Sequence, residues 1–286
     1  MAFSVNSGWQ FWIDRGGTFT DIVAQRPDGS RTVHKLLSEN PERNEDAPIQ
    51  GMRELMGVAS AQPLLAAQIA SIKMGTTVAT NALQARKGDR TIFITTKGFR
   101  DGLRIGYQNR PDIFARQIVL PEMLYEQVVE VDERVSAAGE VLQSISGGTE
   151  QQIRRDLTAA YQQGISACAV SFVHGYRYPE HEQRVAVIAR EIGFTQVSTS
   201  HQISPLIKWV RRSDTTVVDA YLSPILRRYV DRIEAALGQA AESRAKKTQL
   251  LFMQSNGGLT PARYFQGKDS ILSGPAGGIV GAVQTS

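Results

Sequence analysis

Residues 11–23 combine a carboxylate with a glycine turn in a way that suits phosphate and metal chemistry. An aromatic and β-branched run, typical of a largely buried strand, leads into Asp14. Gly16 and Gly17 then break the strand, because glycine turns sharply and lets another group come close to the backbone. The successive amides of a Gly-Gly-Thr turn form a concave nest for phosphate oxygens, and a neighbouring carboxylate holds Mg²⁺. The segment therefore predicts a phosphate-and-metal corner; a plain β-hairpin without a ligand is the alternative.

Further turns of small residues occur at 75–77, 256–258 and 273–278. Each follows a strand-like or apolar run, and the turns at 75–77 and 273–278 precede helical patterns. Helix N-termini present free amides and the positive end of the helix dipole, so they suit phosphates and carboxylates. The sequence contains neither Gly-x-Gly-x-x-Gly nor Gly-x-x-x-x-Gly-Lys-Ser/Thr, so it supports neither a Rossmann site nor a P-loop.

The glycine corner needs β-structure to position it, and the first third of the chain predicts that structure. Residues 20–23 read as the returning strand of a hairpin, with further strands at Thr32–Leu37, Ile69–Met74 and Thr91–Thr95. A charged loop is expected at Pro41–Asp46, and helices are expected from Asp46 to Gly57 and from Val78 to Arg86.

The middle of the chain alternates helix and strand, which implies parallel pairing through right-handed crossovers. On the helix at Gln151–Gln163, we expect the side chains of Ile153, Leu157, Ala160 and Tyr161 to face inward. The other expected elements are an edge strand at Val128–Val135, a turn-rich linker at Ala137–Gly148, strands at Ile165–Val173 and Phe194–Ser198, and a helix at Glu180–Ile192.

The longest helix is expected to begin at Ser213 or Asp214 and to run to about Leu237, because its apolar residues keep a 3.6-residue period. An apolar strand is expected at Thr248–Gln254, and a last helix from Ile279 onward. Together these elements predict an α/β fold with mixed sheets and flanking helices.

Residues 98–121 are irregular and rich in arginine, with Arg100, Arg104, Arg110 and Arg116. One interpretation is a solvated loop with an arginine-rich surface. The other is a loop that lays guanidinium groups over an anionic ligand. The residues alone leave both open.

Composition limits the classes of function. The chain has 286 residues, 42% hydrophobic and 21% charged, as in a globular protein with an ample core. Its net charge of +4 is mild and spread out, which argues against a nucleic-acid partner. Residues 1–9 lack the pattern of a signal peptide, and no apolar run approaches the ~20 residues that span a bilayer. We therefore expect no membrane partner and a cytoplasmic location.

The remaining reactive side chains favour structural roles. Cys168 lies in an apolar strand pattern, so a buried, inert thiol is expected, and a single cysteine excludes an internal disulfide. The histidines lack metal-ligand spacing, and no Ser/His/Asp arrangement is visible. His34 and His181 are interpreted as surface or capping residues. His174 follows a strand at the end where parallel sheets bind ligands, which leaves it a possible substrate role.

A series of motifs resembles the hydantoinase A/5-oxoprolinase family, in order and over nearly the whole chain. The segment Ile13-Asp-Arg-Gly-Gly-Thr-Phe-Thr-Asp21 is similar to the first phosphate motif of that family. Arg15 is the variant that points to the ATP-hydrolysing oxoprolinases within it. The other matching segments are 74–83 with Lys87-Gly88, 96–101 with Arg110-Pro111, 215–222, 253–258 and 273–278.

The resemblance implies a fold, a reaction and partners. The fold is that of the actin, sugar-kinase and heat-shock-chaperone ATPases, which is ribonuclease H-like, here incomplete. The implied reaction opens 5-oxo-L-proline to L-glutamate while ATP is hydrolysed to ADP and phosphate, as in the glutathione cycle. The implied cofactors are ATP and Mg²⁺, with K⁺ as a further candidate. The expected partners are the rest of a longer polypeptide or a hydantoinase B-like protein, in a homo-oligomer.

The same resemblance assigns roles to site residues. Asp14 holds Mg²⁺ through water, while Gly16, Gly17 and Thr18 donate to ATP phosphates. Beside them, Arg15 is a further nucleotide contact, and Thr20 and Asp21 support the loop. The residues expected to face the reacting groups or the nucleotide from elsewhere in the chain are Gly75, Thr76, Thr77, Ser273, Gly274, Gly277 and Gly278.

The resemblance also predicts a division of the chain and an incomplete site. Residues 8–212 are expected to form the N-terminal region of the family, and 213–286 the start of its ATPase domain. The turn at 273–278 resembles the connecting helix of the fold, after which a second Asp-x-Gly-Gly-Thr motif is expected but absent here. We therefore expect little ATPase activity from these residues alone. A hydantoinase or ketone carboxylase subunit, and a nucleotide-binding module without catalysis, are the alternatives.

Overall fold

A computed structural model describes residues 8–39, 46–59, 62, 64, 66–109, 112–238 and 248–285. The chain divides into two units: unit 1 combines the residues up to Ala85 with those from Ile225 onward, and unit 2 is Arg86–Pro224. This division differs from the family regions predicted at 8–212 and 213–286. Residues 41–45 of the loop predicted at Pro41–Asp46, and the pair Arg110-Pro111, lie outside the described residues.

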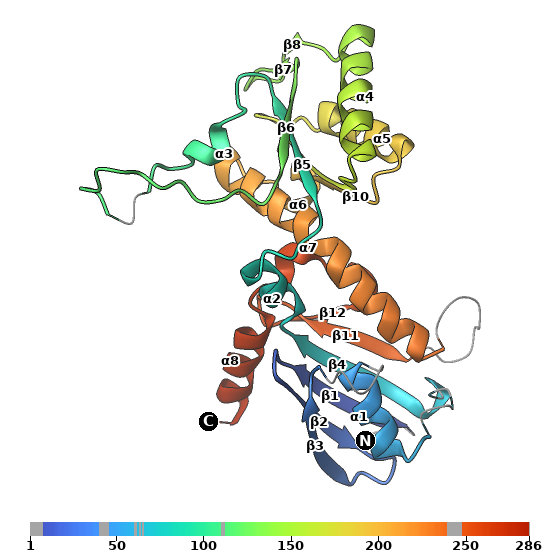
Figure 1. Ribbon diagram of the computed structural model, residues 1–286. Coiled ribbons are helices and arrows are strands. Elements are labelled where there is room, and N and C mark those ends of the chain that lie inside the picture. Colours follow the sequence, from blue (N-terminus) through green and yellow to red (C-terminus); the bar gives the residue numbers. More distant parts are fainter. Residues whose placement is uncertain are drawn as a thin grey trace. The chain divides into compact units, whose positions relative to one another are not determined.

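Unit 1 is built on a six-stranded sheet of order β12-β11-β4-β1-β2-β3 (Figure 1). The predicted hairpin forms its centre, since β1 and β2 pair antiparallel and β3 continues the meander. Strands β4 and β11 are parallel to β1 and to β4, respectively. The strands are β1 Trp9–Arg15, β2 Phe19–Gln25, β3 Arg31–Leu37, β4 Ile69–Thr76, β11 Gln249–Met253 and β12 Leu259–Pro261.

One face of this sheet forms the core of unit 1, because alternate strand residues are apolar. Phe11 and Ile22 are fully buried on this face. Helix α1 (Ala47–Met56) covers it, and Gly51 of α1 packs so closely that a Cβ there would overlap Ile22. Tyr229, in the part of α7 that belongs to unit 1, packs edge-on against Phe252 of β11. The opposite face, with Asp14, carries the more exposed residues and is called the open face below.

Short helices complete unit 1. Asp46 is the N-cap of α1 and Gly57 ends that helix with a left-handed φ of 68°, as predicted. The remaining elements are η1 Ala66–Gln68, α2 Val78–Gln84, η2 Ala262–Tyr264, η3 Gly267–Asp269 and α8 Ser273–Thr285.

The two segments of small residues that were predicted as turns before helices have regular secondary structure instead. Gly75 and Thr76 belong to β4, because their backbones pair with Asp14 and Arg15 of β1. The residues from Ser273 to Gly278 are already helical, so α8 begins six residues before the predicted Ile279. Weak helix formers hid this start, since glycine and proline lower the helical propensity of the first turns.

Unit 2 contains a four-stranded parallel sheet of order β10-β9-β5-β6, as the alternating pattern predicted. Beside it lies a short hairpin of β7, the end of the predicted edge strand Val128–Val135, and β8, which lies in the predicted linker. The elements of this unit are β5 Thr91–Thr96, α3 Gly102–Ile105, β6 Gln127–Val131, β7 Arg134–Val135, β8 Val141–Gln143, α4 Gly147–Gln162, β9 Ala167–Ser171, α5 Glu180–Ile192, β10 Gln196–Thr199, α6 Ser200–Ile203 and the start of α7.

Helices α4 and α5 cover the parallel sheet with the apolar stripes that the sequence predicted. Ile153, Leu157 and Ala160 of α4 are buried in one core cluster. Tyr161 does not face inward as predicted: its side chain is 39% exposed, and its ring lies against Phe194 at the rim of this core.

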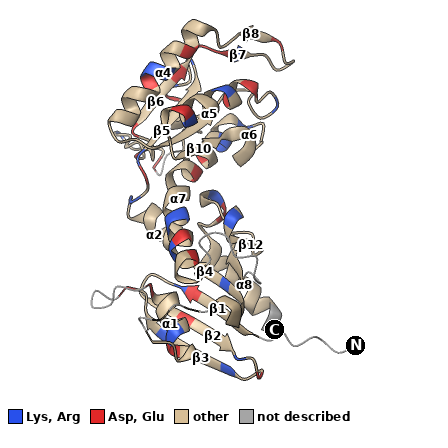
Figure 2. Cartoon of the chain, turned by 90° about the vertical axis from the view of Figure 1, so that its right-hand side faces the viewer, with Lys and Arg blue, Asp and Glu red and all other residues tan. Residues whose placement is uncertain are grey.

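Helix α7 (Trp209–Ala236) begins at Trp209, so the prediction of a start at Ser213 or Asp214 was wrong. Ser213 is fully buried and its hydroxyl lies 2.7 Å from that of Ser171. The prediction followed the capping preference of Ser213 and Asp214, but the helix begins earlier and includes Arg212, whose side chain is fully buried. Acidic and basic residues are interspersed along the elements rather than gathered on one of them (Figure 2).

Candidate phosphate and metal site

The open face of unit 1 carries a pocket of about 560 Å³. It lies over β1, β2, β4 and β11 and reaches the first turns of α8. The predicted site residues that line it are Asp14, Asp21, Gly75, Ser273, Gly274, Gly277 and Gly278. Strand pairing and one helix start therefore bring together residues that are up to 264 positions apart in the sequence.

Two carboxylates face this pocket from neighbouring strands. Asp14 of β1 pairs directly with Asp21 of β2, so both side chains lie on the open face. Gly75 of β4 lies beside Asp14 on the other side, and a Cβ at Gly75 would come within 3.2 Å of Asp14 Oδ1. The absence of a side chain at Gly75 therefore leaves the Asp14 carboxylate accessible from the pocket.

The electrostatics of this pair favour a cation. Partial burial raises the pKa of the Asp14 carboxyl above its ordinary value, and the negative charge of Asp21 raises it further. Lys35 of β3 lies 2.9 Å from Asp21 Oδ1 and offsets part of that charge. A bound cation would relieve the remaining repulsion, since an opposite charge favours the ionised form of a carboxyl group.

The first turn of α8 is fastened to the end of β4. The Ser273 hydroxyl, which is 1% exposed, donates a hydrogen bond of 2.8 Å to the carbonyl oxygen of Thr76. At the next residue the packing is close but unstrained, because a Cβ at Gly274 would meet Thr77 Cγ2 at 3.7 Å. This attachment holds the N-terminal amides of α8 at the edge of the pocket.

The glycine turn between β1 and β2 is closed by its own backbone. The Gly16 amide donates to the carbonyl oxygen of Phe19 at 3.0 Å, so that amide is already used. Ser38 stabilises the turn, because its hydroxyl donates to the Gly16 carbonyl at 2.7 Å and its amide to that of Thr18 at 2.9 Å. The amides of Gly17 and Thr18 have no acceptor among the described residues, which leaves these two as donors for an anion.

Three predicted site residues point into the covered side of the sheet instead. Arg15 lies over the ring of Tyr229 at 5.5 Å, with its side chain 12% exposed. Thr76 is 1% exposed and on the same side. Thr20 is fully buried, and its hydroxyl lies 2.9 Å from that of Ser38. These side chains do not line the pocket, so any contribution they make to it is through the position of the turn.

Thr77 joins the glycine turn to α2. Its amide donates to the Arg15 carbonyl at 3.0 Å, and its hydroxyl lies 3.3 Å from the same oxygen. The side-chain amide of Asn81 donates to the Thr77 hydroxyl at 3.2 Å and would lie 3.3 Å from a Cβ at Gly17. Thr77 is therefore held in place by the turn, and Asn81 was not predicted from the sequence.

Other pocket residues were also missed. Trp12 and Lys73 line the pocket beside Asp14 and Gly75, and the Lys73 ammonium lies 5.1 Å from the centre of the Trp12 ring. Met253 and Leu259 form the opposite wall. Strand alternation places Trp12 with Asp14, so that signal was available. The position of Lys73 depends on the parallel register of β1 and β4, which no local pattern gives.

The pocket residues fit a hydrated magnesium ion with phosphate oxygens. Magnesium keeps several waters and binds through one or two carboxylates together with substrate phosphates, and Asp14 and Asp21 provide such a pair. Within the described residues there is no group of three or more His, Cys, Asp or Glu side chains that could hold a metal alone. The donor set therefore suits a metal that arrives with its phosphate ligand.

Comparison with known proteins places the chain in a family. Residues 10–193 match the hydantoinase/oxoprolinase N-terminal region, and residues 212–286 match the hydantoinase/oxoprolinase model. The chain belongs to the hydantoinase/oxoprolinase family. It is 42% identical to the 5-oxoprolinase of Saccharomyces cerevisiae over 96% of this chain. That match covers 23% of the yeast protein, so the chain spans about a quarter of the length of such relatives.

Two solved structures share the fold of this chain. One is the nucleotide-free structure of acetone carboxylase, an enzyme of ATP-dependent acetone carboxylation. It matches with a TM-score of 0.77 and 24% identity, over 96% of this chain and 40% of the carboxylase chain. The ATP-dependent caprolactamase of Pseudomonas jessenii matches with a TM-score of 0.76 and 28% identity, over 97% and 41%. The chain therefore has the α/β, actin-like ATPase-type fold that the sequence predicted.

The histidines and the cysteine lie outside the pocket. His174, His181 and His201 belong to unit 2, where His201 Nδ1 lies 2.7 Å from Glu182 and His181 Nδ1 lies 2.7 Å from Glu133. Cys168 is fully buried in β9, as predicted. Across the described part of the chain, no helix has the length and apolar character needed to cross a membrane.

Proposed function

We propose that this chain is the part of an ATP-dependent 5-oxoprolinase that holds the first phosphate-binding corner. The observation that carries the proposal is the pocket in which Asp14, Asp21 and Gly75 meet the first turn of α8. The identity of 42% to the yeast 5-oxoprolinase supports the substrate, and the two structural relatives, an acetone carboxylase and a caprolactamase, are both ATP-dependent enzymes.

In this proposal each group of residues has a distinct task. Asp14, assisted by Asp21, orients a hydrated Mg²⁺, while the amides of Gly17, Thr18 and Gly274 donate to phosphate oxygens. A bound nucleotide would supply the phosphoryl group that activates the carbonyl carbon of 5-oxoproline, so that water could add there, the ring C–N bond could break with a proton going to nitrogen, and phosphate could then leave from the opened chain. Such chemistry depends on positioning and charge stabilisation more than on a covalent nucleophile.

Nucleotide binding by the purified chain tests the corner directly. Calorimetric titration with ATP should give saturable binding that requires Mg²⁺, and Asp14→Asn should weaken it at least about tenfold, or about 1.4 kcal/mol. Asp28→Asn, in the exposed β2–β3 turn, is the matched control and should bind like the parent chain. Equal binding by the Asp14→Asn variant would refute the proposed role of this carboxylate.

The substrate is tested in a longer protein. The matching quarter of the yeast 5-oxoprolinase is replaced by this chain, and ADP release is measured with 5-oxoproline, a hydantoin or caprolactam. We expect 5-oxoproline to stimulate ADP release most strongly. Stimulation by caprolactam instead would favour the second candidate, a lactamase like the caprolactamase, which is 28% identical to this chain. Nucleotide binding without turnover on any of these would favour a non-catalytic module.

A further inference from the structure

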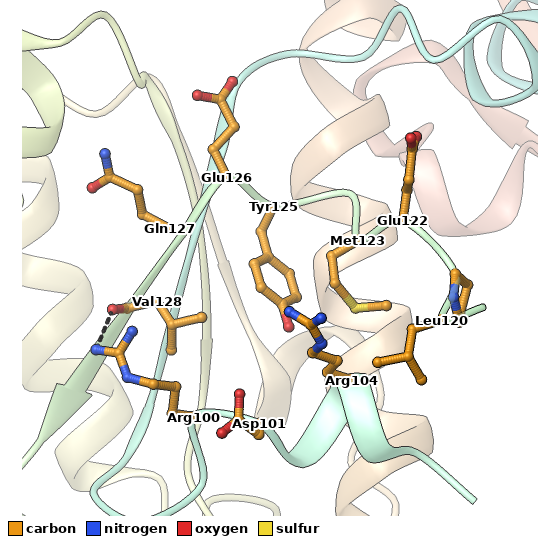
Figure 3. A pocket seen from close by; sticks show the side chains of 11 residues that line it. Arg100, Asp101, Arg104, Leu120, Glu122, Met123, Tyr125, Glu126, Gln127 and Val128 are labelled. Atoms are coloured by element: carbon orange, nitrogen blue, oxygen red, sulfur yellow. Dashed lines mark hydrogen bonds between the residues drawn. The ribbon is translucent and has the colours of Figure 1, made fainter. Parts of the chain in front are cut away.

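Unit 2 contains a separate pocket of about 700 Å³, between α3 and the segment that leads into β6 (Figure 3). It belongs to the arginine-rich region, for which the sequence left a solvated loop and an anion-binding loop as alternatives. Arg100 and Arg104 both line it, whereas Arg116 is exposed and does not.

Several charges around this pocket are already paired. Arg100 binds Glu130, with Nε 3.2 Å from Oε2, and donates to the carbonyl oxygen of Val128 at 3.2 Å. Glu126 accepts two hydrogen bonds from Arg90, of 2.8 and 2.6 Å. Both Arg100 and Glu126 are therefore engaged by the protein itself and have little capacity left for a ligand.

The side chains that remain are Asp101, Arg104 and Tyr125. Figure 3 shows these three pointing toward one another in the middle of the pocket, while Glu122 and Glu126 point away from them. Among the described residues, Arg104 forms no ion pair with a carboxylate. Partial burial, and then the charges of Asp101 and Asp214, raise the pKa of Tyr125, so its hydroxyl remains a hydrogen-bond donor at neutral pH.

An aromatic cluster holds these groups in place. The Tyr125 ring packs on Phe93 at 5.4 Å, and Phe93 packs on Trp209 at 6.2 Å. Trp209 also fills the space beside Gly102, the residue after Asp101, where a Cβ would overlap its ring. The donor and acceptor groups of the pocket are thus attached to a packed core, which reduces the entropy lost when a ligand binds.

We propose that this pocket binds a small carboxylic acid that carries an N–H group on its α-carbon. The guanidinium of Arg104 and the hydroxyl of Tyr125 donate to the carboxylate, and Asp101 accepts the hydrogen of the α-nitrogen. The planar fork of arginine matches a carboxylate in two parallel hydrogen bonds. The choice of 5-oxoproline or glutamate as the ligand within this class rests on the proposed function. The preference for a carboxylate with an α N–H group rests only on Asp101, Arg104 and Tyr125.

The charge of the pocket argues against a nucleotide as its occupant. Asp101 and Glu122 place two carboxylates on its lining, against one arginine that is not already paired. A triphosphate would be repelled by these acids, whereas a monoanion with a donor group can satisfy both Arg104 and Asp101. This site is also separate from the proposed phosphate corner, whose residues all belong to unit 1.

Matched ligands test the proposal without any mutation. Calorimetry on the nucleotide-free chain compares 5-oxo-L-proline with its carboxamide, which lacks the carboxylate, and with its lactone analogue, which has a ring oxygen in place of N–H. We expect saturable binding of 5-oxo-L-proline and binding of each analogue that is weaker by about tenfold or more. No saturable binding up to about 10 mM, or equal affinity for all three ligands, would overturn the proposal.

Variants then assign each preference to its residue. Arg104→Gln should abolish the preference for the acid over the carboxamide, and Asp101→Asn should reduce the preference for the lactam over the lactone. Arg116→Gln should leave both preferences unchanged. If the Arg104→Gln variant has the same melting temperature as the parent chain and still prefers the acid to the carboxamide, the role assigned to Arg104 is wrong.

The outcome can be separated from that of the proposed function. Asp14→Asn should leave 5-oxoproline binding intact, because Asp14 belongs to the other pocket. A chain that binds 5-oxoproline through Arg104 but does not bind Mg²⁺ and ATP would support this inference and refute the phosphate corner. If 5-oxoproline binding is lost in Asp14→Asn and kept in Arg104→Gln, the acid binds in unit 1, and the proposed site in unit 2 is refuted.

Discussion

The carboxylates of Asp14 and Asp21 lie directly across from each other on β1 and β2, on the open face of the sheet. Two acids at paired positions of neighbouring strands repel each other, and an antiparallel sheet without a ligand would place opposite charges or apolar residues there. Lys35 offsets only the Asp21 side of this pair, through a contact of 2.9 Å. The arrangement therefore costs stability that a bound cation would restore.

Replacing Asp14 should stabilise the fold while it weakens the site. Folding raises the pKa of Asp14 from its ordinary 3.8, so the folded chain holds a proton that the unfolded chain releases as the pH rises. The folded state loses stability across that window, and the loss persists at neutral pH. Asp14→Asn should therefore unfold at a higher urea concentration at pH 7, by less than about 1 kcal/mol because the pair is solvated.

Two measurements check this prediction. The gain in stability from Asp14→Asn should disappear as the pH falls below 3.8, where Asp14 is protonated in both the folded and the unfolded chain, and Mg²⁺ should raise the melting temperature of the parent chain but not that of Asp14→Asn. Asp28→Asn is the control of opposite sign, since a hydrogen bond from Ser30 lowers the pKa of Asp28. A loss of stability in Asp14→Asn at pH 7 would contradict the repulsion.

A methyl group at Gly75 should impair the site with little effect on the fold. Its Cβ would approach Asp14 Oδ1 at 3.2 Å, a distance at which the carboxylate must shift by a few tenths of an ångström. We expect Gly75→Ala to weaken Mg²⁺-dependent nucleotide binding about tenfold. Gly281→Ala in α8, where a Cβ has nothing within 4 Å, should bind like the parent chain. Calorimetric titration of the three proteins provides the comparison.

The local patterns predicted the strands and helices of this chain better than their ends. The hairpin around Gly16, helix α5 and the parallel sheet of unit 2 follow from alternation and periodicity, which act over short distances. The start of α7 was missed because Ser213 and Asp214 favour helix caps, whereas the helix begins at Trp209 and includes the fully buried Arg212. That burial is stabilised by carbonyl oxygens distant in sequence, such as Phe172 O.

The site was predictable in its residue types but not in its geometry. Asp14 and the glycine turn lie in one motif, and the sequence predicts a metal and phosphate there. Gly75 and Ser273 join Asp14 only through the pairing of β4 with β1 and the attachment of α8 to β4. Successive residues of a strand point to opposite faces of the sheet, so Gly75 faces the pocket while its neighbour Thr76 is buried on the other face.

The attachment of α8 depends on one buried hydroxyl. Ser273→Ala removes the donor to the Thr76 carbonyl, which leaves a buried acceptor unsatisfied and should lower the free energy of unfolding by about 1 kcal/mol. The amides of α8 should also exchange with deuterium faster than in the parent chain. Ser30→Ala, at an exposed turn of the same unit, should leave the exchange of the α8 amides unchanged. Unchanged exchange in α8 would show that other contacts hold the helix.

Cys168 should report on the integrity of unit 2. Complete burial raises the pKa of its thiol to about 12, so thiolate is scarce at pH 8 and no reagent can reach it. The folded chain should therefore not react with a thiol-specific disulfide reagent at pH 8, and it should react fully in urea. Rapid reaction of the folded chain would mean that β9 opens, or that the thiol is not buried.

A buried carboxylate in unit 2 should be the most sensitive single position for stability. Glu182 is fully buried and accepts hydrogen bonds from the Phe172 amide at 2.9 Å, the Ser200 hydroxyl at 2.5 Å and the His201 amide at 3.1 Å. Ser200 in turn accepts from Arg212 Nε at 2.9 Å, so the two buried charges are joined through one hydroxyl. Removing one of them leaves the other without compensation.

Glu182→Gln should therefore lower the free energy of unfolding by about 3 kcal/mol, because it removes the charge and turns one acceptor into a donor. Glu180→Gln, at an exposed position two residues earlier on α5, should change it by no more than about 0.5 kcal/mol. Urea unfolding gives both values, and the reactivity of Cys168 shows whether the loss is in unit 2. If the two variants unfold alike, the network of Glu182 and Arg212 does not stabilise this unit, and the burial of both charges needs a different cause.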